Sequence, residues 1–397
     1  MKILVICQYY FPEQFRINDI CESLAKKDHD VTVLTGLPNY PEGRVPKEYK
    51  FFRKRKENYK GVNIIRTFEI GRRQGAFFRL LNYLSYMVSA SCKAMFLKEK
   101  YDIVYIYQLS PITMAIPGII YKKIHKKKTV LYCLDLWPGS VTTFGIKANS
   151  ILYKAIERIS NHIYKQIDQL VVSSEMFKQE LQNKNKSDII YMPQYAEEIF
   201  QKKGTINNGI FDFVFAGNIG KVQSVETIIK AAKILEKNPK IKFHIIGDGS
   251  ALGDCKRLAE DLRLKNICFY GKKNLNEMQQ YYELADAMIV TLGKNEVISK
   301  TLPAKIQTCM LAGKPIIAAA NGAIKKIIIS EANCGMCSEA EDEQELAENL
   351  KKFTQLSEKE IKNMGDNAEI FYNENFRKHN FIEKLIQILE RKGNNNV

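Results

Sequence analysis

The feature that most constrains the fold is a repeated alternation of short apolar runs with helical stretches. The apolar runs are continuous and rich in Val, Ile and Phe, which is typical of strands buried on both faces of a parallel sheet. Helical stretches such as 77–97 and 151–166 separate them. This alternation predicts an α/β fold with helices on both faces of each sheet. The predicted strands are 2–7, 30–35, 62–67, 103–107, 129–134, 169–173, 188–192, 211–216, 242–246, 267–270, 287–292 and 315–319.

The chain has 397 residues, which is enough for two domains with separate cores. The stretch 197–208 is polar and lacks a helix or strand period, so we place the domain linker there. We predict two Rossmann-like domains that face each other across a cleft, because ligands bind at the carboxyl ends of parallel strands. The predicted parts are residues 1–200, residues 209–370, and a carboxyl-terminal helix and tail at 371–397 that packs back on the first domain.

The charge is strongly positive: 60 Lys and Arg against 44 Asp and Glu give +16, and the isoelectric point is near 9.2. An excess of this size indicates an anionic partner. The sequence contains no RNP, zinc-finger or basic-zipper pattern, so we expect no nucleic-acid partner. Phosphate ligands or an anionic membrane surface are favoured instead.

Nine cysteines are scattered along the chain, mostly inside apolar runs, which suits the reduced thiols of a cytosolic protein. Cys334 and Cys337 have CxxC spacing but lack a second pair or a nearby histidine, so we interpret them as structural and predict no metal site. The first apolar run, 1–7, is too short for a signal peptide. The uncharged stretch 103–121 is broken by polar residues and prolines, so it predicts a strand and a helix rather than a membrane span.

Residues 299–322 predict a helix N-terminus at the carboxyl edge of the second sheet. Thr301 and Pro303 form a helix-start pattern, and Gly313 followed by Pro315 ends the helix at about residue 312. The helix lies between two predicted buried strands, so its N-terminus should face an anionic ligand. The local pattern alone fits an ordinary βαβ unit equally well.

Glycines follow two other strands of the second domain. Gly217 and Gly220 follow the first strand, and Gly247 and Gly249 follow the second. Neither pair completes a P-loop or a dinucleotide-binding fingerprint. Glycine does allow the backbone to approach a ligand closely. With 270–273 and the helix above, these turns should gather at one sheet edge.

The order of these strand-end motifs resembles the nucleotide-sugar-binding domain of family 4 glycosyltransferases with the GT-B fold, and the likeness covers nearly the whole chain. Three segments resemble a bacterial branch in O-antigen and capsule synthesis that includes L-fucosamine-type transferases. These are Asp135-Leu-Trp137-Pro, Leu37-Pro-Asn-Tyr-Pro-Glu-Gly43 and Pro303-Ala-Lys305.

The resemblance implies a retaining transferase without a protein nucleophile. The expected donor is a nucleotide-diphosphate sugar, UDP-linked, with an N-acetylated amino sugar among the candidates. The expected acceptor is a polyprenyl-diphosphate-linked saccharide bound by the first domain. No cofactor is implied beyond the nucleotide-sugar, which is a substrate.

The chain departs from the family at the positions that contact the sugar. Two glutamates of the family correspond to Lys300 and Thr308 when the sequences are aligned on Gly313-Lys-Pro315. The departure leaves the donor sugar open, and it keeps two alternatives in view. One is a nucleotide-sugar 2-epimerase of the same architecture, and the other is a non-catalytic nucleotide-sugar-binding protein.

The Arg and Lys that usually follow the first strand of the second domain correspond to Asn218 and Gln223. We therefore assign Lys221 and Lys305 to the donor diphosphate, where cations and a helix N-terminus stabilise the leaving group. The expected donor-binding residues are Gly217, Asn218, Gln223, Ser224, Gly247, Asp248, Gly249, Gly271, Lys272, Thr301, Leu302, Pro303, Ala304 and Thr308.

Asp135 follows a predicted strand of the first domain and is the expected contact to the reacting sugar or acceptor hydroxyl; capping of the following turn is an equal alternative. Trp137 is the single tryptophan and is expected either to stack on a sugar or to lie in the core. Arg16 lies beside the predicted first helix and is expected to contact a phosphate. The expected acceptor-binding residues are Pro12, Glu13, Arg16, Asn39, Tyr40 and Trp137.

A basic segment, 53–56 with Arg72 and Arg73, precedes the aromatic helical stretch 77–87. This combination predicts docking of the first domain on an anionic bilayer, although the helix fits an ordinary core-packed helix as well. Docking would bring the protein to the cytoplasmic face of the cell membrane as a peripheral protein.

Overall fold

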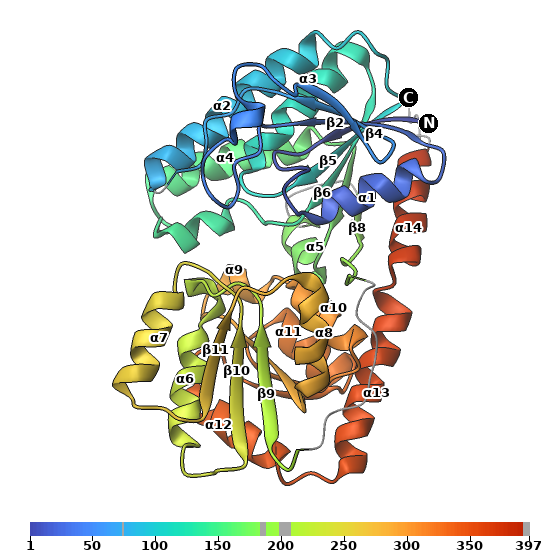
Figure 1. Cartoon of the computed structure of the whole chain (residues 1–397). Helices are drawn as coiled ribbons and strands as arrows, with labels where there is room; N and C mark the ends of the chain where they lie inside the picture. Colours follow the sequence, from blue (N-terminus) through green and yellow to red (C-terminus); the bar gives the residue numbers. More distant parts are fainter. Residues whose placement is uncertain (74, 183–187, 198–207, 392–397) are drawn as a thin grey trace. The chain divides into compact units, whose positions relative to one another are not determined.

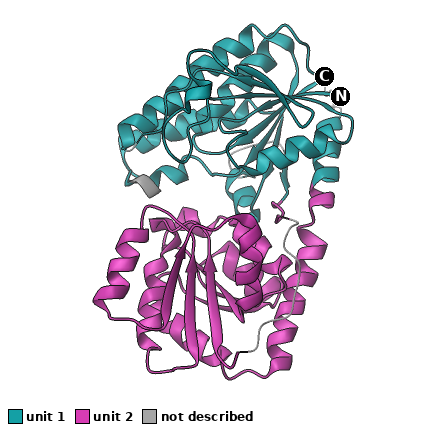
Figure 2. Ribbon diagram, in the orientation of Figure 1, with its two compact units in different colours: residues 1–192, 382–397 teal, residues 193–381 magenta. Residues whose placement is uncertain are grey.

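The computed structural model describes residues 1–73, 75–182, 188–197 and 208–391. Figure 1 traces the chain, which forms two compact units. One unit comprises residues 1–192 and 382–397, and the other comprises residues 193–381 (Figure 2). The division therefore falls just before the polar stretch 197–208, most of which lies outside the described residues. The final helix, α14 (Lys378–Glu390), contains the boundary between the second unit and the returning end of the first.

The first unit is built on an eight-stranded sheet with the order β3-β4-β2-β1-β5-β6-β7-β8. All neighbouring strands are parallel except β3 and β4. The central strands β1, β5 and β6 are buried, as expected for strands covered on both faces. The strands are β1 (Lys2–Ile6), β2 (Asp30–Thr35), β3 (Lys56–Tyr59), β4 (Val62–Arg66), β5 (Ile103–Gln108), β6 (Lys128–Cys133), β7 (Gln169–Val172) and β8 (Ile189–Tyr191).

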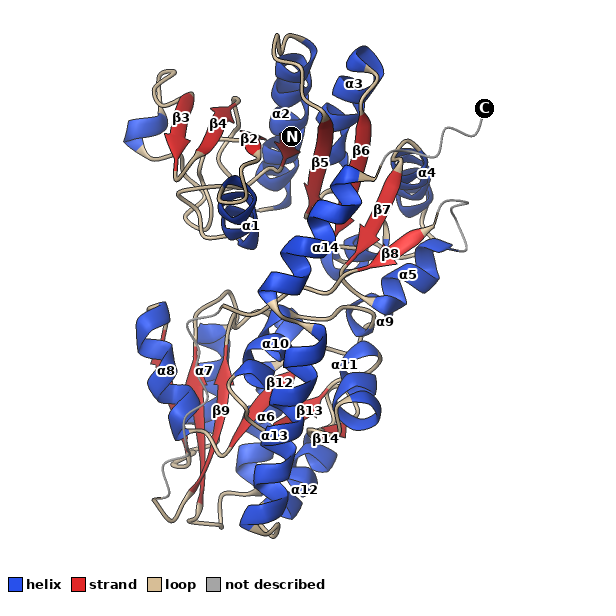
Figure 3. Ribbon diagram, turned by 90° about the vertical axis from the view of Figure 1, so that its right-hand side faces the viewer, coloured by secondary structure: helices blue, strands red, loops and turns tan. Residues whose placement is uncertain are grey.

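Helices flank this sheet, and the longest of them, α2, packs against α3 (Figure 3). Ser150 caps α4 by accepting a hydrogen bond from the Tyr153 backbone N–H at 3.2 Å, which satisfies one of the unpaired donors at a helix start. The helices, apart from α14, are α1 (Arg16–Ala25), α2 (Ala76–Met95), α3 (Ile116–His125), α4 (Ile151–Lys165) and α5 (Glu175–Gln182).

The second unit has a six-stranded, wholly parallel sheet with the order β11-β10-β9-β12-β13-β14. Its strands are β9 (Phe211–Ala216), β10 (Ile241–Ile246), β11 (Ile267–Gly271), β12 (Ala287–Thr291), β13 (Ile316–Ala319) and β14 (Gly335–Ser338). Its helices are α6 (Val225–Ile234), α7 (Leu252–Asp261), α8 (Leu275–Leu284), α9 (Glu296–Ser299), α10 (Ala304–Leu311), α11 (Ala323–Lys325), α12 (Glu343–Phe353) and α13 (Glu358–Asn375), with a π-helical turn at Lys326–Glu331.

Successive side chains of these strands enter two different cores. On β9, Val214 and Ala216 pack with α8, α10 and α13, whereas Phe213 and Phe215 pack with α6, α7 and α12. Residues one position apart point to opposite faces of a strand, so helices must cover both faces. This confirms the predicted α/β fold with two parallel sheets.

Three local expectations differ from the structure. The basic segment at 53–56 runs into a strand, β3, whose antiparallel pairing is not expected from a parallel α/β pattern. The edge strand β14, which contains Cys337, is absent from the predicted strands; the Cys337 Sγ donates to the Ala320 carbonyl at 3.2 Å. Thr301 does not cap α10: Pro303 occupies the N-cap, and the Thr301 hydroxyl donates to the Ile298 carbonyl at 2.7 Å.

Phe353 tests the packing of the second core. Its ring is fully buried and lies 5.8 Å from the ring of Phe213. Phe353→Ala should lower the free energy of unfolding by about 3–5 kcal/mol, because it removes apolar contacts and leaves a cavity. Urea unfolding followed by far-UV circular dichroism measures the change.

Ile370→Ala is the control for this substitution, because Ile370 is 54% exposed on α13. The control should change the free energy of unfolding little. A Phe353→Ala protein as stable as the control would show that Phe353 does not anchor this core.

Candidate functional site

The carboxyl edge of the second sheet has a topological switch point between β9 and β12. β9 pairs with β10 on one side and with β12 on the other, so the connections that follow these strands leave in opposite directions. Such a point opens a crevice in which α/β proteins bind ligands. The turns after β9, β10, β12 and β13 surround it.

Two glycine turns at this edge pack directly against each other. A Cβ at Gly247 would lie 1.8 Å from the Gly217 carbonyl oxygen, and both residues have positive φ, +142° and +146°. The Gly217 N–H donates to the Ile246 carbonyl at 2.9 Å. A side chain at Gly247 is therefore excluded by sterics, and the glycine pattern in the sequence has a backbone-packing cause.

Several predicted donor-binding side chains bond to one another at these turns. The Asn218 amide donates to Gln223 Oε1 at 2.9 Å, and the Gly220 N–H donates to the same oxygen at 3.2 Å. Asp248 Oδ1 accepts from the Gly249 N–H at 2.7 Å. Their polar atoms shape the turns, so the ligand-facing groups of these turns are chiefly backbone.

Lys305 is the distinctive side chain of this edge. Its Nζ is buried and has no hydrogen-bond partner among the residues that the structure describes. It lies 4.1 Å from the centroid of the Phe215 ring and 3.2 Å from where a Cβ at Gly217 would be. Burial lowers the pKa of this ammonium to about 8. The structure thus brings Lys305, Gly217 and the first turn of α10 together, as the sequence predicts.

The N-terminal turn of α10 supplies the other anion-binding feature. Pro303 is its N-cap, and the helix dipole places partial positive charge at Ala304 and Lys305. Thr308 lies one turn further along, and its hydroxyl donates to the Ala304 carbonyl at 3.3 Å. Leu302 is partly buried and packs on the core that α10 covers.

The remaining residues that we predict to bind the sugar donor lie at the same edge but differ in burial and in their contacts. Ser224 is buried with left-handed φ, and its hydroxyl bonds that of Thr227 at 2.9 Å. Lys221 and Lys272 are exposed. Gly271 is the last residue of β11, and its carbonyl accepts from the Gly247 N–H at 2.9 Å.

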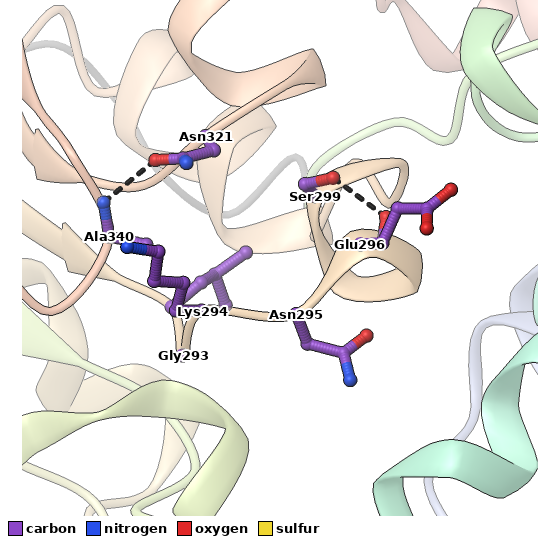
Figure 4. A pocket seen from close by; sticks show the side chains of 8 residues that line it. Gly293, Lys294, Asn295, Glu296, Ser299, Asn321 and Ala340 are labelled. Atoms are coloured by element: carbon purple, nitrogen blue, oxygen red, sulfur yellow. Dashed lines mark hydrogen bonds between the residues drawn. The ribbon is translucent and has the colours of Figure 1, made fainter. Parts of the chain in front are cut away.

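A pocket of about 310 Å³, with five polar residues in its lining, opens beyond the ends of β12, β13 and β14 (Figure 4). Asn321 Oδ1 accepts from the Ala340 N–H at 2.7 Å, and the Ser299 hydroxyl donates to the Glu296 carbonyl at 2.7 Å. Its lining residues are Leu292, Gly293, Lys294, Asn295, Glu296, Ser299, Asn321 and Ala340.

Sequence reasoning missed this pocket, although its residues follow two predicted strands. The position of Asn321 directly after β13 was the available signal, because strand carboxyl ends share one edge. Lys300, next to the pocket, pairs with Glu296 at 2.8 Å. Throughout the described ranges, no group of three His, Cys, Asp or Glu side chains is placed to hold a metal ion.

Asp135 lies at the carboxyl edge of the first sheet, after β6. Its two carboxylate oxygens accept hydrogen bonds from the hydroxyls of Ser110 and Ser140. Trp137 is partly buried, and its Nε1–H donates to the Ser110 hydroxyl at 3.0 Å. The Asp135 carboxylate is therefore fixed by two loops, and Trp137 shares a partner with it.

The predicted acceptor residues of the first loops have mainly internal contacts. Glu13 is buried, and its Oε1 accepts from the backbone N–H groups of Asn39 and Tyr40 at 2.6 and 2.5 Å. Burial raises the pKa of Glu13 to about 7 despite these bonds. Pro12 is exposed, and Arg16 is the first residue of α1.

A buried polar network that the sequence did not reveal links these loops to α2. Glu69 Oε1 accepts from the side-chain amides of Gln8 and Asn82 at 2.8 and 2.5 Å. The Tyr9 hydroxyl donates to Asn82 Oδ1 at 3.2 Å. Burial raises the pKa of Glu69 well above its usual range.

Comparison with known proteins places the two units in described families. Residues 15–193 match Glycosyltransferase Family 4, and residues 196–371 match Glycosyl transferases group 1. WbjE of Pseudomonas aeruginosa, named as a glycosyltransferase, is 28% identical over 273 residues, which cover 65% of this chain and 67% of the relative.

Two further comparisons cover most of the chain. WcaI of Escherichia coli strain K12, named as a colanic acid biosynthesis glycosyl transferase, is 23% identical over 337 residues, or 79% of this chain and 82% of the relative. Anabaena HepE, solved in complex with UDP and glucose, superposes with a TM-score of 0.70 at 14% identity, covering 99% of this chain and 100% of HepE. At that identity the likeness concerns the fold.

The two family matches follow each other along the chain and coincide with its two α/β units. The group 1 match covers the second unit, which is the part of the chain where the strand-end motifs predict a nucleotide-sugar-binding domain. The chain is therefore a glycosyltransferase with the GT-B fold, and its first unit matches the model of Glycosyltransferase Family 4.

Proposed function

We propose that this enzyme transfers a sugar from a UDP-linked donor to a polyprenyl-diphosphate-linked saccharide, with retention of configuration, in the synthesis of a cell-surface polysaccharide. The observation that carries the proposal is the buried, unpaired ammonium of Lys305 beside the N-terminus of α10. A buried cation without a hydrogen-bond partner is costly, and a bound diphosphate would offset that cost.

The proposed reaction needs charge stabilisation more than it needs a protein nucleophile. The acceptor hydroxyl oxygen forms a bond to the anomeric carbon while the bond from that carbon to the donor phosphate oxygen breaks. The electron pair leaves with the nucleotide diphosphate, and the hydroxyl proton is released. Lys305, the α10 N-terminus and the exposed Lys221 would stabilise the departing charge. We assign Asp135 to the acceptor hydroxyl.

The comparisons support the choice of substrate class. HepE, which has the same fold, was solved with UDP and glucose, which supports a UDP-linked donor. The name of WcaI, colanic acid biosynthesis, supports a polysaccharide pathway. The pocket beside Asn295 and Asn321 is where we place the sugar hydroxyls, with the Lys300–Glu296 pair next to it.

Lys305→Gln tests the diphosphate assignment. The substitution should weaken UDP binding by about tenfold or more, because a charge-assisted hydrogen bond contributes roughly 1.5–3 kcal/mol. Wild-type affinity should also fall as the pH rises through about 8, where the ammonium loses its proton. Affinity of the variant should not change across that range. Isothermal titration calorimetry at several pH values measures both effects.

The matched control is Lys256→Gln, which makes the same charge change at an exposed position on α7. It should bind UDP like the wild type. Equal affinity in the Lys305 and Lys256 variants would contradict the assignment. UDP-sugar turnover without lipid acceptor would indicate an epimerase, and binding without turnover of any donor and acceptor would indicate a binding protein.

We further propose that the first unit docks on the cytoplasmic face of an anionic membrane. Phe51 and Phe52 are 86% and 84% exposed, and four basic residues, 53–56, follow them directly. Aromatic side chains that insert at the interface, beside cations that attract anionic headgroups, suit peripheral binding. Among the helices that the structure describes, none combines the length and apolar content needed to cross a bilayer.

The exposed stripe of α2 is a second apolar feature of this unit. Its residues are spaced three, four or seven positions apart along one side of the helix, and the other side packs in the unit. α2 therefore has both a packed side and an exposed apolar side, and the exposed side supports the docking proposal. Its members are Phe77, Leu80, Leu84, Val88 and Met95.

Phe51→Ser combined with Phe52→Ser tests docking. The double substitution should lower partitioning onto phosphatidylglycerol-containing vesicles by about tenfold or more, because it removes two apolar side chains from the interface. Vesicle flotation measures partitioning, and UDP binding should stay unchanged. Ile370→Ser, an exposed apolar position of the second unit, is the control. If binding of the wild type to vesicles did not depend on their anionic lipid content, the proposed electrostatic contribution to docking would be contradicted.

A further inference from the structure

Arg72 does not lie on the open surface with the rest of the basic segment. Its side chain is partly buried, and the guanidinium carbon lies 5.6 Å from the centroid of the Tyr83 ring. Arg73, the next residue, is exposed and stacks on Phe78 instead, with 5.5 Å between the guanidinium carbon and the ring centroid. The two neighbouring arginines therefore have different environments, and only Arg72 is turned into the unit.

The Arg72 charge has no anionic partner in the part of the chain that the structure describes. None of the ion pairs there involves its guanidinium. The carboxyl of Glu69 belongs to the same polar cluster, but its Oε1 accepts from the side-chain amides of Gln8 and Asn82, and no ion pair between described residues joins it to Arg72. An arginine held in a partly dry site without a counter-ion is a ready site for an anion.

A hydroxyl without a partner lies beside this cation. Tyr83 is 9% exposed, and no described group makes a hydrogen bond to its hydroxyl. The Arg72 guanidinium lies over the ring of this same tyrosine. The Tyr9 hydroxyl also interacts with the Arg72 guanidinium. A guanidinium and a phenol that converge in this way can both donate to phosphate oxygens.

The position of Arg72 is fixed by buried groups. Its backbone N–H donates to Asn39 Oδ1 at 2.9 Å, and Asn39 is buried. A Cβ at Gly43 would lie 2.5 Å from the Arg72 carbonyl oxygen, so the two loops pack backbone against backbone. This fixed backbone reduces the entropy that the side chain loses when it binds a ligand.

We propose that Arg72 and the Tyr83 hydroxyl form a diphosphate-binding subsite of the first unit, which takes the diphosphate of a prenyl-diphosphate acceptor. The inference deepens the proposed function and rests on its lipid-linked acceptor. From the sequence, Arg72 is expected to attract an anionic membrane together with the other basic residues of its segment. The proposal assigns Arg72 to a single ligand, the acceptor diphosphate. Arg72 would bind both phosphates through its planar set of donors, which a lysine cannot reproduce.

The test is direct binding, independent of turnover. The protein is titrated with geranyl diphosphate and, separately, with geraniol, in buffer without membrane. Trp137 is the only tryptophan, and its ring N–H bonds Ser110 next to Asp135, so its fluorescence reports this edge. Arg72→Gln should raise the Kd for geranyl diphosphate about tenfold or more. The Kd for geraniol should be unchanged.

Three further variants separate binding from folding. Arg73→Gln, the matched charge control, should bind geranyl diphosphate like the wild type. Tyr83→Phe keeps the ring but should raise the Kd a few-fold, because one hydrogen bond is lost. Arg72→Lys keeps the charge and should recover only part of the affinity. If Arg72→Gln lowers the unfolding temperature, the comparison rests on Tyr83→Phe and Arg72→Lys.

Several outcomes would overturn the subsite. Equal affinity of wild type and the Arg72 variants for geranyl diphosphate would do so, as would no binding by the wild type. If the Arg72 variants lost affinity for geraniol and for geranyl diphosphate equally, Arg72 would have a structural role only. If Arg72→Gln weakened binding to phosphatidylglycerol vesicles but bound geranyl diphosphate like the wild type, the anion at Arg72 would be a membrane headgroup. UDP binding is measured separately, and its absence in the wild type would contradict the proposed function while leaving the prenyl-diphosphate result intact.

Discussion

The pairing of β9 with β12 is the constraint on which the second unit depends. It reverses the order in which strands are added, so that β10 and β11 extend the sheet on one side and β13 and β14 on the other. The connections on either side of that pair then diverge, and Gly217 is left at the opening with Lys305 beside it. Because the sheet is parallel, every other ligand-facing turn falls on the same edge.

Lys305 and Arg72 share one feature: neither has a carboxylate partner among the residues that the structure describes. Lys305 has an aromatic ring beneath its ammonium, and Arg72 has one beneath its guanidinium. A ring face attracts a cation weakly and offers no hydrogen-bond acceptor of the strength of a carboxylate. Each site therefore tolerates a buried or partly buried cation and leaves N–H donors available for phosphate oxygens. The same chemistry in both units supports the proposed donor and the proposed acceptor, which are both diphosphates.

Much of the fold could be predicted from the sequence, because short continuous apolar runs that alternate with helical stretches are typical of strands buried on both faces of a parallel sheet. The strand at 211–216 was predicted with its observed bounds, and most others within one or two residues. β3 was missed because its residues, Lys56–Tyr59, are half exposed at an antiparallel edge and carry no apolar run. At the site, Lys305 was predicted from its place at a helix start. Glu69 and Asn82 were missed, since a polar residue that is buried looks like a surface residue in the sequence.

The sequence by itself determined the α/β class, the two-domain length, the glycine turns and the helix start before Lys305, because each depends on local period or local backbone freedom. Only the tertiary structure decided what each polar side chain does. The structure shows that Glu13 and Asn39, which we predict to meet the acceptor, accept hydrogen bonds from backbone N–H groups of neighbouring loops. Arg72 and Arg73 are adjacent in sequence, yet one is turned onto Tyr83 and the other is exposed. Burial and partner geometry arise from contacts between distant segments, which adjacency in the sequence does not specify.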